Sequence, residues 1–443
     1  MTVTVRFAPS PTGLLHVGNA RMVLINWLFA ANQKGKFILR MDDTDLARSK
    51  PEFADAIERD LLWLGLQWDE KFCQSDRLAQ YDAAFVSLKS QGLLYACYET
   101  PDELDLKRKR QLTRGRPPVY DRSGLDLTDK ERKKYEDEGR KPHWRFKLAH
   151  EDITWKDLVR GDVHFQGENL SDPVLRREDG SWLYMLPSVV DDIDMGVTHV
   201  IRGEDHVANT AVQIQFFKAL GAEPSGFAHL PLLTDISGKG LSKRSGSITL
   251  ESMRDEGIEA IALNNFLGQL GGGDNETVHG TLDALAQDVD IAQYGRGTPK
   301  FDQHQLEIVN ARVLHAMPFD QAQDRLATMD LPQADKVFWL AVRANLEKLD
   351  DIRDWHAVCF ETLETPVDDA AFIESARSLL PDDPWDEGTW KLWTQAVGKE
   401  TERKGKNLFL PLRRTLTGHD HGPELKILLP IMGRARVFER LQS

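Results

Sequence analysis

The first part of the chain changes from a strand pattern to a helix pattern and back. Residues 2–7 alternate, with Val3, Val5 and Phe7 on one face, which predicts a strand. A loop with proline and glycine follows, then a helical pattern over about 18–33 and a second strand pattern over 36–42. A strand, a helix and a strand in this order predict a βαβ unit, and therefore a parallel sheet with a right-handed crossover.

The pattern changes again further along the chain. Residues 99–150 are rich in charge and poor in apolar periodicity, as expected of an insertion. A second αβ half begins near Tyr184, and residues 229–234 predict another strand. Helical patterns dominate from 258 onward, for example over 337–349. We therefore predict an α/β fold with a Rossmann-like parallel sheet, an inserted subdomain and an all-α C-terminal region.

Composition narrows the class of protein. The chain has 443 residues, of which 41% are hydrophobic and 28% charged, a balance typical of folded domains. Its longest apolar stretch, 22–31, is too short to cross a bilayer, and the N-terminus lacks the pattern of a signal peptide. The three cysteines lie far apart, which fits a reducing compartment. We expect a cytoplasmic protein with no membrane partner.

Charge is distributed unevenly over the C-terminal third. The net charge of the whole chain is −14, so any nucleic acid must be held by a local basic surface. Residues 311–390 carry 7 basic and 17 acidic side chains, whereas 391–443 carry 11 basic and 5 acidic ones. The second segment could face phosphates; a solvated helical surface is the alternative, and charge alone favours the alternative.

The loop after the first predicted strand is a candidate phosphate site. Residues 9–21 read PSPTGLLHVGNAR, a loop that opens into a helix and directs free backbone N–H groups to one point. His16 could donate to a phosphate oxygen, and Gly18 would let adenosine approach the bare backbone. An ordinary turn with a surface histidine is the alternative, because a single His-x-Gly is a weak signal.

A second candidate segment, 237–246, reads SGKGLSKRSG. Its small residues and its cations, Lys239, Lys243 and Arg244, fit a loop that closes over a triphosphate. By itself it reads as an exposed basic loop. The two segments together are stronger evidence for a phosphate site than either one alone. Both lie at strand ends of one predicted sheet, where open α/β sheets bind ligands. Arg6 is a further candidate, since a charge within an apolar strand is costly unless it is paired.

These segments resemble the two signatures of the glutamyl-/glutaminyl-tRNA synthetases, a group of class I aminoacyl-tRNA synthetases. The first signature corresponds to RFAPSPTGLLHVGNAR and the second to GLSKRSG. The order and spacing of further segments are similar to those of bacterial glutamyl-tRNA synthetases over nearly the whole chain: RMDDTDLARSKPE, GLLYACYETPDEL, VVDDIDMGVTHVIRGEDH and KGKNLFLPLRRTLTG.

The resemblance implies a division into domains and an activity. The implied domains are a Rossmann catalytic domain in two halves, 1–95 and 184–250, an inserted acceptor-binding subdomain, 96–183, a stem-contact helical subdomain, 251–310, and an α-helical anticodon-binding region, 311–443. The implied reaction is the ATP-dependent attachment of L-glutamate to the 3′ end of tRNA-Glu through glutamyl-adenylate, with release of AMP and pyrophosphate. ATP would arrive with Mg²⁺, and the enzyme would be a monomer.

The resemblance also assigns site residues. ATP would be bound by Ala8, Ser10, His16, Gly18, Asp205, Leu233 and Lys243, with His16 and Lys243 as the catalytic candidates. Glutamate would be bound by Arg6, Ser10, Asp42, Tyr184, Ser188 and Arg202. These residue types suit the ligand, because guanidinium groups and a hydroxyl match a carboxylate and an aspartate matches an ammonium group. Activation needs no protein nucleophile, so catalysis would rest on positioning and charge stabilisation.

The chain departs from the family pattern in three respects: its two signatures, Asp42 and the region where some relatives hold zinc. Asn19 and Gly240 replace a histidine and a lysine of the two signatures, and Lys239 could supply the missing cation. Asp42 stands where many relatives have glutamate, so its contact with the substrate amino group would be longer or bridged by water. Some relatives hold zinc near 97–125, but Cys97 lacks cysteine partners there, so we predict no structural zinc and no other bound metal.

Two alternatives remain from sequence, and the sequence argues against a third. The enzyme could charge tRNA-Gln as well as tRNA-Glu, and nothing in 311–443 decides between them. The chain could instead be a catalytically weak paralogue that only binds tRNA, although His16, Lys243 and both arginines are retained. A synthetase that modifies a tRNA base would end after the catalytic region, whereas this chain continues into the helical region 311–443.

Overall fold

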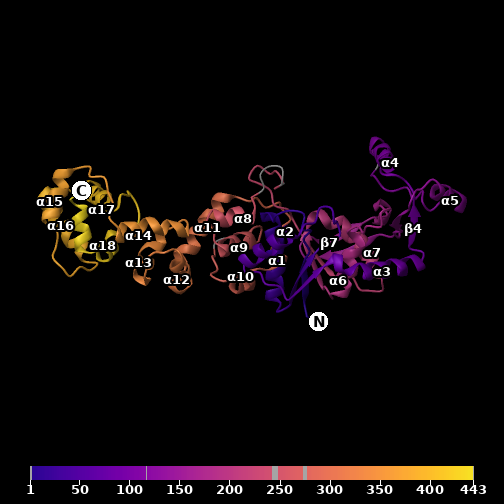
Figure 1. The fold of residues 1–443 in the computed structure, drawn as a ribbon, viewed down its shortest axis with the longest axis horizontal. Helices are drawn as coiled ribbons and strands as arrows, with labels where there is room; N and C mark the ends of the chain where they lie inside the picture. Colours follow the sequence, from indigo (N-terminus) through magenta and orange to yellow (C-terminus); the bar gives the residue numbers. More distant parts are fainter. Residues whose placement is uncertain (1, 116, 242–247, 273–276, 443) are drawn as a thin grey trace. The chain divides into compact units, whose positions relative to one another are not determined.

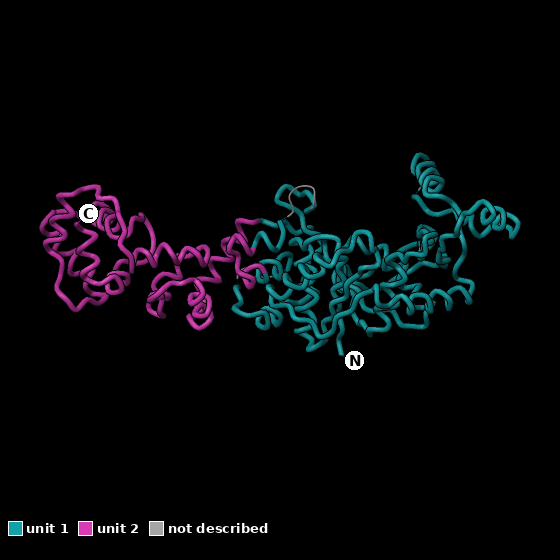
Figure 2. The backbone as a smooth tube through the Cα atoms, in the orientation of Figure 1, with its two compact units in different colours: residues 1–253, 264–302 teal, residues 254–263, 303–443 magenta. Residues whose placement is uncertain are grey.

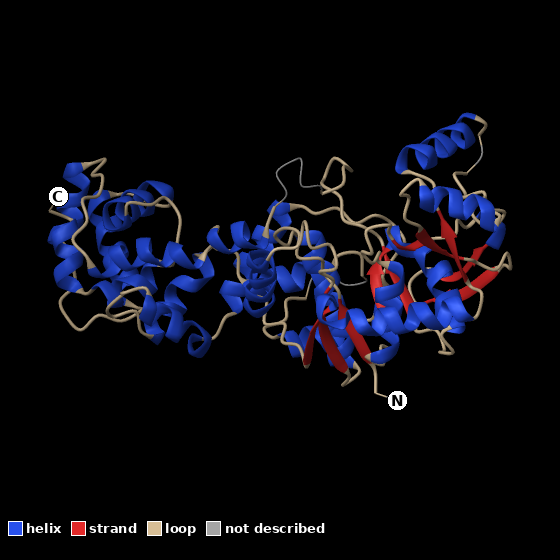
Figure 3. Cartoon of the chain, turned by 45° about the vertical axis from the view of Figure 1, so that its right-hand side comes forward, coloured by secondary structure: helices blue, strands red, loops and turns tan. Residues whose placement is uncertain are grey.

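The computed structural model describes residues 2–115, 117–241, 248–272 and 277–442. The chain forms two compact units (Figure 2). Unit 1 comprises residues 1–253 and 264–302, and unit 2 comprises 254–263 and 303–443. Figure 3 shows that the strands lie in unit 1, whereas the described part of unit 2 consists of helices and loops.

Parallel strands form the centre of unit 1 (Figure 1). β1 (Thr4–Phe7), β2 (Lys36–Met41) and β3 (Glu70–Cys73) are parallel neighbours in that order. In a second sheet, β9 (His199–Gly203), β10 (Gly226–Leu230) and β6 (Ile153–Asp157) are parallel neighbours, and β7 (Gly161–Phe165) runs antiparallel to β6. A backbone hydrogen bond from Thr198 to the carbonyl of Thr4 joins the two sheets at β1. The predicted parallel sheet is confirmed.

The first strand is more deeply buried than its alternation predicts. All four residues of β1 are buried, including Thr4 and Arg6, because neighbours cover the strand on both faces. The helix after it, α1 (Val17–Asn32), and the next strand, β2, agree closely with the predicted ranges. β10 differs, because it ends at Leu230 rather than 234; Pro231 follows and has no N–H group for a sheet.

The predicted insertion contains an antiparallel sheet of its own. β4 (Leu94–Cys97), β5 (His143–Phe146) and β8 (Val174–Arg176) form this sheet, with β5 in the middle. Two helices without buried residues extend from it, α4 (Pro101–Thr113) and α5 (Asp129–Asp137), which explains the missing apolar periodicity. β6 and β7 also come from the predicted insertion, yet they extend the sheet of β9 and β10.

Helices surround the parallel strands of unit 1. Their bounds are α2 Pro51–Trp63, α3 Leu78–Ser90, α6 Met185–Asp194, α7 Val207–Ala219 and α10 Leu282–Asp288, and two helices span the boundaries of the units, α8 Leu250–Asp255 and α9 Ala260–Gln269. The core joins the insertion to the second αβ half, since the ring of Phe146 on β5 stacks on Phe216 of α7 at 4.1 Å between centroids.

Unit 2 is helical, as predicted for the C-terminal region. Its helices are α11 Gln303–Ala316, α12 Phe319–Thr328, α13 Lys336–Val342, α14 Ile352–Phe360, α15 Ala370–Ser378, α16 Thr389–Thr401, α17 Lys406–Thr417, α18 Leu425–Met432 and α19 Arg434–Arg440. The helix expected over 337–349 is shorter, because α13 gives way to a 3₁₀ turn at 343–345. Trp339 and Trp393 are completely buried in this unit.

Several basic side chains of 391–443 are paired within unit 2. Arg403 binds Asp369 at 2.5 Å, and Arg414 binds Asp368 at 2.9 Å. Arg440 is buried and donates to main-chain carbonyls. The acidic segment before 391 therefore neutralises part of the basic segment after it, so less of the net charge of +6 faces solvent than the sequence suggests.

Candidate active site

A cavity of about 680 Å³ opens in unit 1 at the carboxyl ends of β1 and β9. This is the edge at which parallel sheets bind ligands. Nine residues predicted from sequence are among those that line it: Arg6, Ala8, Ser10, His16, Gly18, Tyr184, Arg202, Asp205 and Leu233. The structure thus brings together residues from separate segments of the sequence. Asp42 and Ser188 are not among the lining residues, and Lys243 lies outside the described residues.

The loop after β1 presents His16 at the start of α1. His16 is the N-cap of the helix, and its Nδ1 accepts a hydrogen bond from the N–H of Gly18 at 3.1 Å. The accepting nitrogen carries no proton, so the proton of the neutral ring lies on Nε2. Asn19 completes the cap, because its Oδ1 accepts from the backbone N–H of His16 at 3.5 Å. The departure at Asn19 therefore preserves the helix start.

Gly18 keeps space open beside this histidine. A Cβ at this position would lie 2.9 Å from the His16 ring, closer than real Cβ contacts allow. Any other residue would push the imidazole out of its capping position. The approach of adenosine to Gly18 stays a prediction, and the His16 ring is a second reason for glycine at this position.

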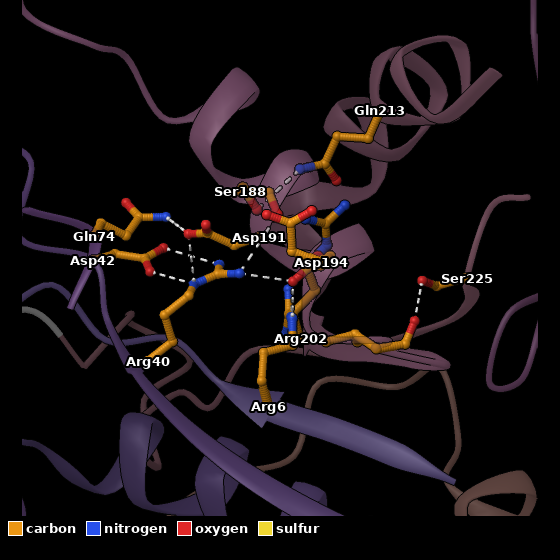
Figure 4. Close-up of polar contacts among 12 residues, drawn as sticks. Arg6, Arg40, Asp42, Gln74, Ser188, Asp191, Asp194, Arg202, Gln213 and Ser225 are labelled. Atoms are coloured by element: carbon orange, nitrogen blue, oxygen red, sulfur yellow. Dashed lines mark hydrogen bonds and ion pairs between the residues drawn. The ribbon is translucent and has the colours of Figure 1, made fainter. Parts of the chain in front are cut away.

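A buried network of charges lies behind Arg6 (Figure 4). Asp192 on α6 binds the Arg6 Nε at 3.0 Å and the Arg40 Nη1 at 2.8 Å. Arg77 binds Asp191 at 2.7 Å. The two arginines beside Asp192 hold its pKa below the ordinary value, although burial acts in the opposite direction. Asp191 and Asp192 both lie within α6 and pair with arginines.

Asp42 belongs to this network. Its two carboxylate oxygens accept from Arg40, with Oδ1 at 2.7 Å from Nε and Oδ2 at 3.3 Å from Nη2. Burial raises the pKa of Asp42 despite the charges of Arg40 and Arg6. Ser188 is also fully buried, and its hydroxyl accepts from Gln213 at 3.4 Å. Both residues therefore support the wall of the cavity from behind.

Arg202 presents a buried positive charge at the cavity. Its exposed fraction is 7%, and it donates to Tyr184 Oη at 2.8 Å, Thr210 Oγ1 at 2.6 Å and His229 Nε2 at 3.3 Å. All of these acceptors are uncharged side-chain atoms. Within the described part of the chain Arg202 forms no ion pair with a carboxylate, and burial lowers its pKa. A buried cation with only neutral partners is arranged to receive an anion.

The second candidate segment is described only in part. Gly240 and Leu241 line the cavity, whereas Lys239 is exposed and is not among the lining residues. The backbone N–H of Lys239 binds Asp235 Oδ1 at 2.9 Å, which fixes the turn before Gly240.

Sequence reasoning missed several residues of the site. Thr298 lines the cavity although it is far from either signature in the sequence. His206 also lines it and lay within a matched motif without an assigned role. His229 and Thr210 touch Arg202 from behind, and no spacing rule connects residues that meet only in the folded sheet.

Three potential metal ligands meet elsewhere in unit 1. Ligand atoms of Cys97, Glu99 and His143 lie within 4.8 Å of one another, and the sequence argument had missed His143. Burial raises the pKa of Cys97 to about 11, so the thiol keeps its proton. The Lys107 ammonium lies 3.1 Å from Glu99 Oε1, and the Tyr120 hydroxyl lies 3.4 Å from Cys97 Sγ. A tetrahedral zinc site needs four ligands, so this cluster does not fit one, and the absence of zinc stays a prediction.

Two known protein families match this chain, one over most of unit 1 and the other over most of unit 2. Residues 2–307 match the family "tRNA synthetases class I (E and Q), catalytic domain", and residues 313–443 match "Anticodon binding domain". The chain belongs to the class I tRNA synthetases of the E and Q group. The parallel sheet and the helical C-terminal unit are the parts of this synthetase fold that the sequence predicted.

Relatives match this synthetase over its full length. It is 55% identical over 442 residues to a glutamate–tRNA ligase of Azospirillum brasilense and 52% identical over 446 residues to glutamate–tRNA ligase 1 of Rhodospirillum rubrum; each match covers 100% of this chain and 99% of the relative. A crystal structure of a glutamate tRNA ligase from Elizabethkingia meningosepticum in complex with its amino acid has a TM-score of 0.85 at 26% identity, covering 100% of this chain and 99% of that one.

Proposed function

We propose that this synthetase attaches L-glutamate to the 3′ end of tRNA-Glu. The glutamate α-carboxylate attacks the α-phosphorus of ATP and pyrophosphate leaves. A ribose hydroxyl of the tRNA then attacks the glutamyl carbonyl and AMP leaves. Full-length relatives that are named glutamate–tRNA ligases support this activity, and the retained cavity argues against a paralogue that only binds tRNA.

The observation that carries the proposal is the buried guanidinium of Arg202. It faces the cavity, and its partners among the described side chains are neutral, so a substrate carboxylate supplies the missing opposite charge. Tyr184, which accepts from Arg202, also lines the cavity and offers its hydroxyl to the same carboxylate. Glutamate and glutamine have nearly the same shape, but an amide NH₂ group would meet N–H donors without accepting from them. The pocket therefore selects by charge.

Arg6 is the second proposed contact for the glutamate side chain. Its Nε is held by Asp192, and it lines the cavity at an exposed fraction of 4%. Because Asp192 also binds Arg40, the carboxylate is fixed from two sides and holds the Arg6 side chain in one position. Asp42 is committed to Arg40, so we expect its contact with the substrate ammonium group to be bridged by water.

ATP is assigned to the part of the cavity near the start of α1. His16 offers its Nε2 proton to a phosphate oxygen, while Ala8, Ser10, Gly18, Asp205 and Leu233 surround the nucleotide. Lys243 is proposed to stabilise the charge that develops on the leaving pyrophosphate. Mg²⁺ enters as part of the ATP complex. No predicted or described residue is assigned to a resident metal.

The tRNA contact, the oligomeric state and the compartment are proposed as the sequence predicted them. The helical residues 311–443 bind the anticodon end of tRNA, and the enzyme acts as a monomer in the cytoplasm. Among the described helices, none is long and apolar enough to cross a bilayer. The division into domains given above is proposed with the same assignment.

A charging assay on purified tRNA-Glu and purified tRNA-Gln tests the function. We expect ATP-dependent transfer of glutamate to tRNA-Glu, with Lys243→Ala as a control of strongly reduced rate. Transfer to tRNA-Gln as well would establish the broader specificity. Failure of glutamate transfer to either tRNA, in a folded preparation that still binds tRNA, would show that the chain is only a tRNA-binding relative.

A further inference from the structure

Arg202 is supported from behind by a buried pair of side chains from two other strands. His229 on β10 accepts from the Arg202 Nε at 3.3 Å, and its Nδ1 lies 2.5 Å from Oδ2 of Asp157 on β6. Asp157 also accepts from the backbone N–H groups of Val159 at 3.0 Å and Arg160 at 2.9 Å. The exposed fractions of His229 and Asp157 are 0% and 2%.

The hydrogen bonds determine the tautomer of His229. A carboxylate can only accept, so the proton of the imidazole lies on Nδ1 and points to Asp157. Nε2 is then left with a lone pair, which faces the Nε–H of Arg202 and the hydroxyl of Thr210 at 2.9 Å. An arginine can only donate, and therefore this tautomer is the one that suits it.

The charges at the pair agree with this arrangement. Burial lowers the pKa of His229, and the nearby Arg202 lowers it further, while Asp157 acts in the opposite direction. The hydrogen bonds that Asp157 receives outweigh its burial and hold its pKa at about 2. At neutral pH the pair is therefore an ionised aspartate and a neutral histidine.

We propose that Asp157 and His229 are positioning residues for amino-acid selection: Asp157 holds the imidazole in the tautomer whose Nε2 accepts from Arg202, and this contact aims the guanidinium at the substrate carboxylate. The proposal rests on the proposed function of Arg202. It gives the predicted insertion a part in reading the amino acid, because β6, which carries Asp157, comes from that segment.

The contacts separate this role from simple packing. Thr210 accepts from Arg202 Nη2 at 2.6 Å while its hydroxyl lies against His229 Nε2. If the proton moved to Nε2, that N–H would compete with Arg202 for the Thr210 oxygen and would face the Arg202 Nε–H. Arg202 would lose one acceptor and share another, although no volume in the core would change.

Asp157→Asn tests the proposal, because an amide of the same size can present its NH₂ group to Nδ1 and drive the proton to Nε2. The assay is steady-state charging of tRNA-Glu by the full-length enzyme. We expect the glutamate KM to rise about tenfold, as for a lost hydrogen bond to a charged group, while the ATP KM and the kcat at saturating glutamate stay near wild type. As the glutamate KM rises, the preference for glutamate over glutamine should fall.

A second substitution provides the rescue. The Oε1 of glutamine reaches the place of the histidine Nε2 and accepts without depending on a tautomer, so His229→Gln should keep the glutamate KM within about threefold of wild type. The double variant Asp157→Asn/His229→Gln should have the glutamate KM of His229→Gln alone, lower than that of Asp157→Asn. His229→Leu, which offers no acceptor, should raise the KM as Asp157→Asn does.

Asp152→Asn is the matched control, because Asp152 forms a different aspartate–histidine pair on the surface. Asp152 directly precedes β6 and lies 2.9 Å from His164 of β7. The substitution should leave every constant unchanged. The proposal is overturned if Asp157→Asn leaves the glutamate KM unchanged. It is also overturned if the double variant raises the glutamate KM by the product of the factors of the two single variants. If the wild-type enzyme charges no tRNA with glutamate, the proposed function is refuted instead. If Arg202→Ala keeps the wild-type glutamate KM, the assignment of Arg202 to the glutamate pocket is refuted.

Discussion

Replacing Arg202 by alanine is the sharpest perturbation of the proposed glutamate pocket. The change removes a buried guanidinium that faces the cavity and is held by Tyr184, Thr210 and His229. We expect the glutamate KM in tRNA charging to rise steeply, the ATP KM to stay nearly constant, and the preference for glutamate over glutamine to narrow.

The size of the effect follows from the surroundings of Arg202. Its exposed fraction of 7% means that water screens the pair with a substrate carboxylate only weakly. Truncating one partner of a buried charge-assisted pair costs about 2–4 kcal/mol, which corresponds to about 30- to 1,000-fold in apparent affinity. Arg202→Lys keeps the charge but loses the planar fork, so its glutamate KM should fall between wild type and Arg202→Ala.

Arg59→Ala serves as the control, because Arg59 is an exposed arginine of unit 1 outside the cavity lining. It should leave both KM values unchanged. Circular dichroism and a thermal melt establish that Arg202→Ala is folded. If the folded variant keeps the wild-type glutamate KM and the wild-type preference, the pocket is assigned to the wrong residues.

Further predictions concern the catalytic cation, the RNA surface and metal. Lys243→Ala should lower kcat about 10²–10³-fold with little change in the glutamate KM, and a near wild-type rate would remove its proposed role. Lys404 and Lys406 are exposed, so replacing both with alanine should weaken tRNA binding and reduce the salt slope by about 1 per lost phosphate contact; an unchanged slope would exclude them from the RNA surface. Elemental analysis of the pure protein should find less than stoichiometric zinc, whereas one zinc per chain would contradict the predicted absence of a structural zinc.

The fold was largely predictable because its signals are local. A strand, a proline- and glycine-rich loop and a helix follow one another in the first βαβ unit, and their bounds agree with β1, α1 and β2. Two strands differ from the prediction, for different reasons. β10 ends at Leu230 because Pro231 follows it, a local signal that the strand pattern over 229–234 overlooked. β6 lies within the predicted insertion but pairs with β10, and no periodicity in the sequence indicates that pairing.

The site was predictable only as far as the matched motifs reach. Nine assigned residues meet in the cavity, but the sequence could not show that Asp42 is taken up by Arg40 or that Asp192 holds Arg6. Arg6 was expected to need a partner because a buried charge is costly, and its partner came from a helix far along the chain. Such pairings depend on which strands become neighbours.

The central claim is that the cavity reads glutamate by the charge of its side chain. The most direct measurement is the ratio of kcat/KM for glutamate and for glutamine in charging of tRNA-Glu by the wild-type enzyme. The buried guanidinium groups of Arg6 and Arg202 predict a preference for glutamate of at least about 10³-fold, since an amide leaves buried donors unpaired. Comparable kcat/KM values for the two amino acids would contradict the claim.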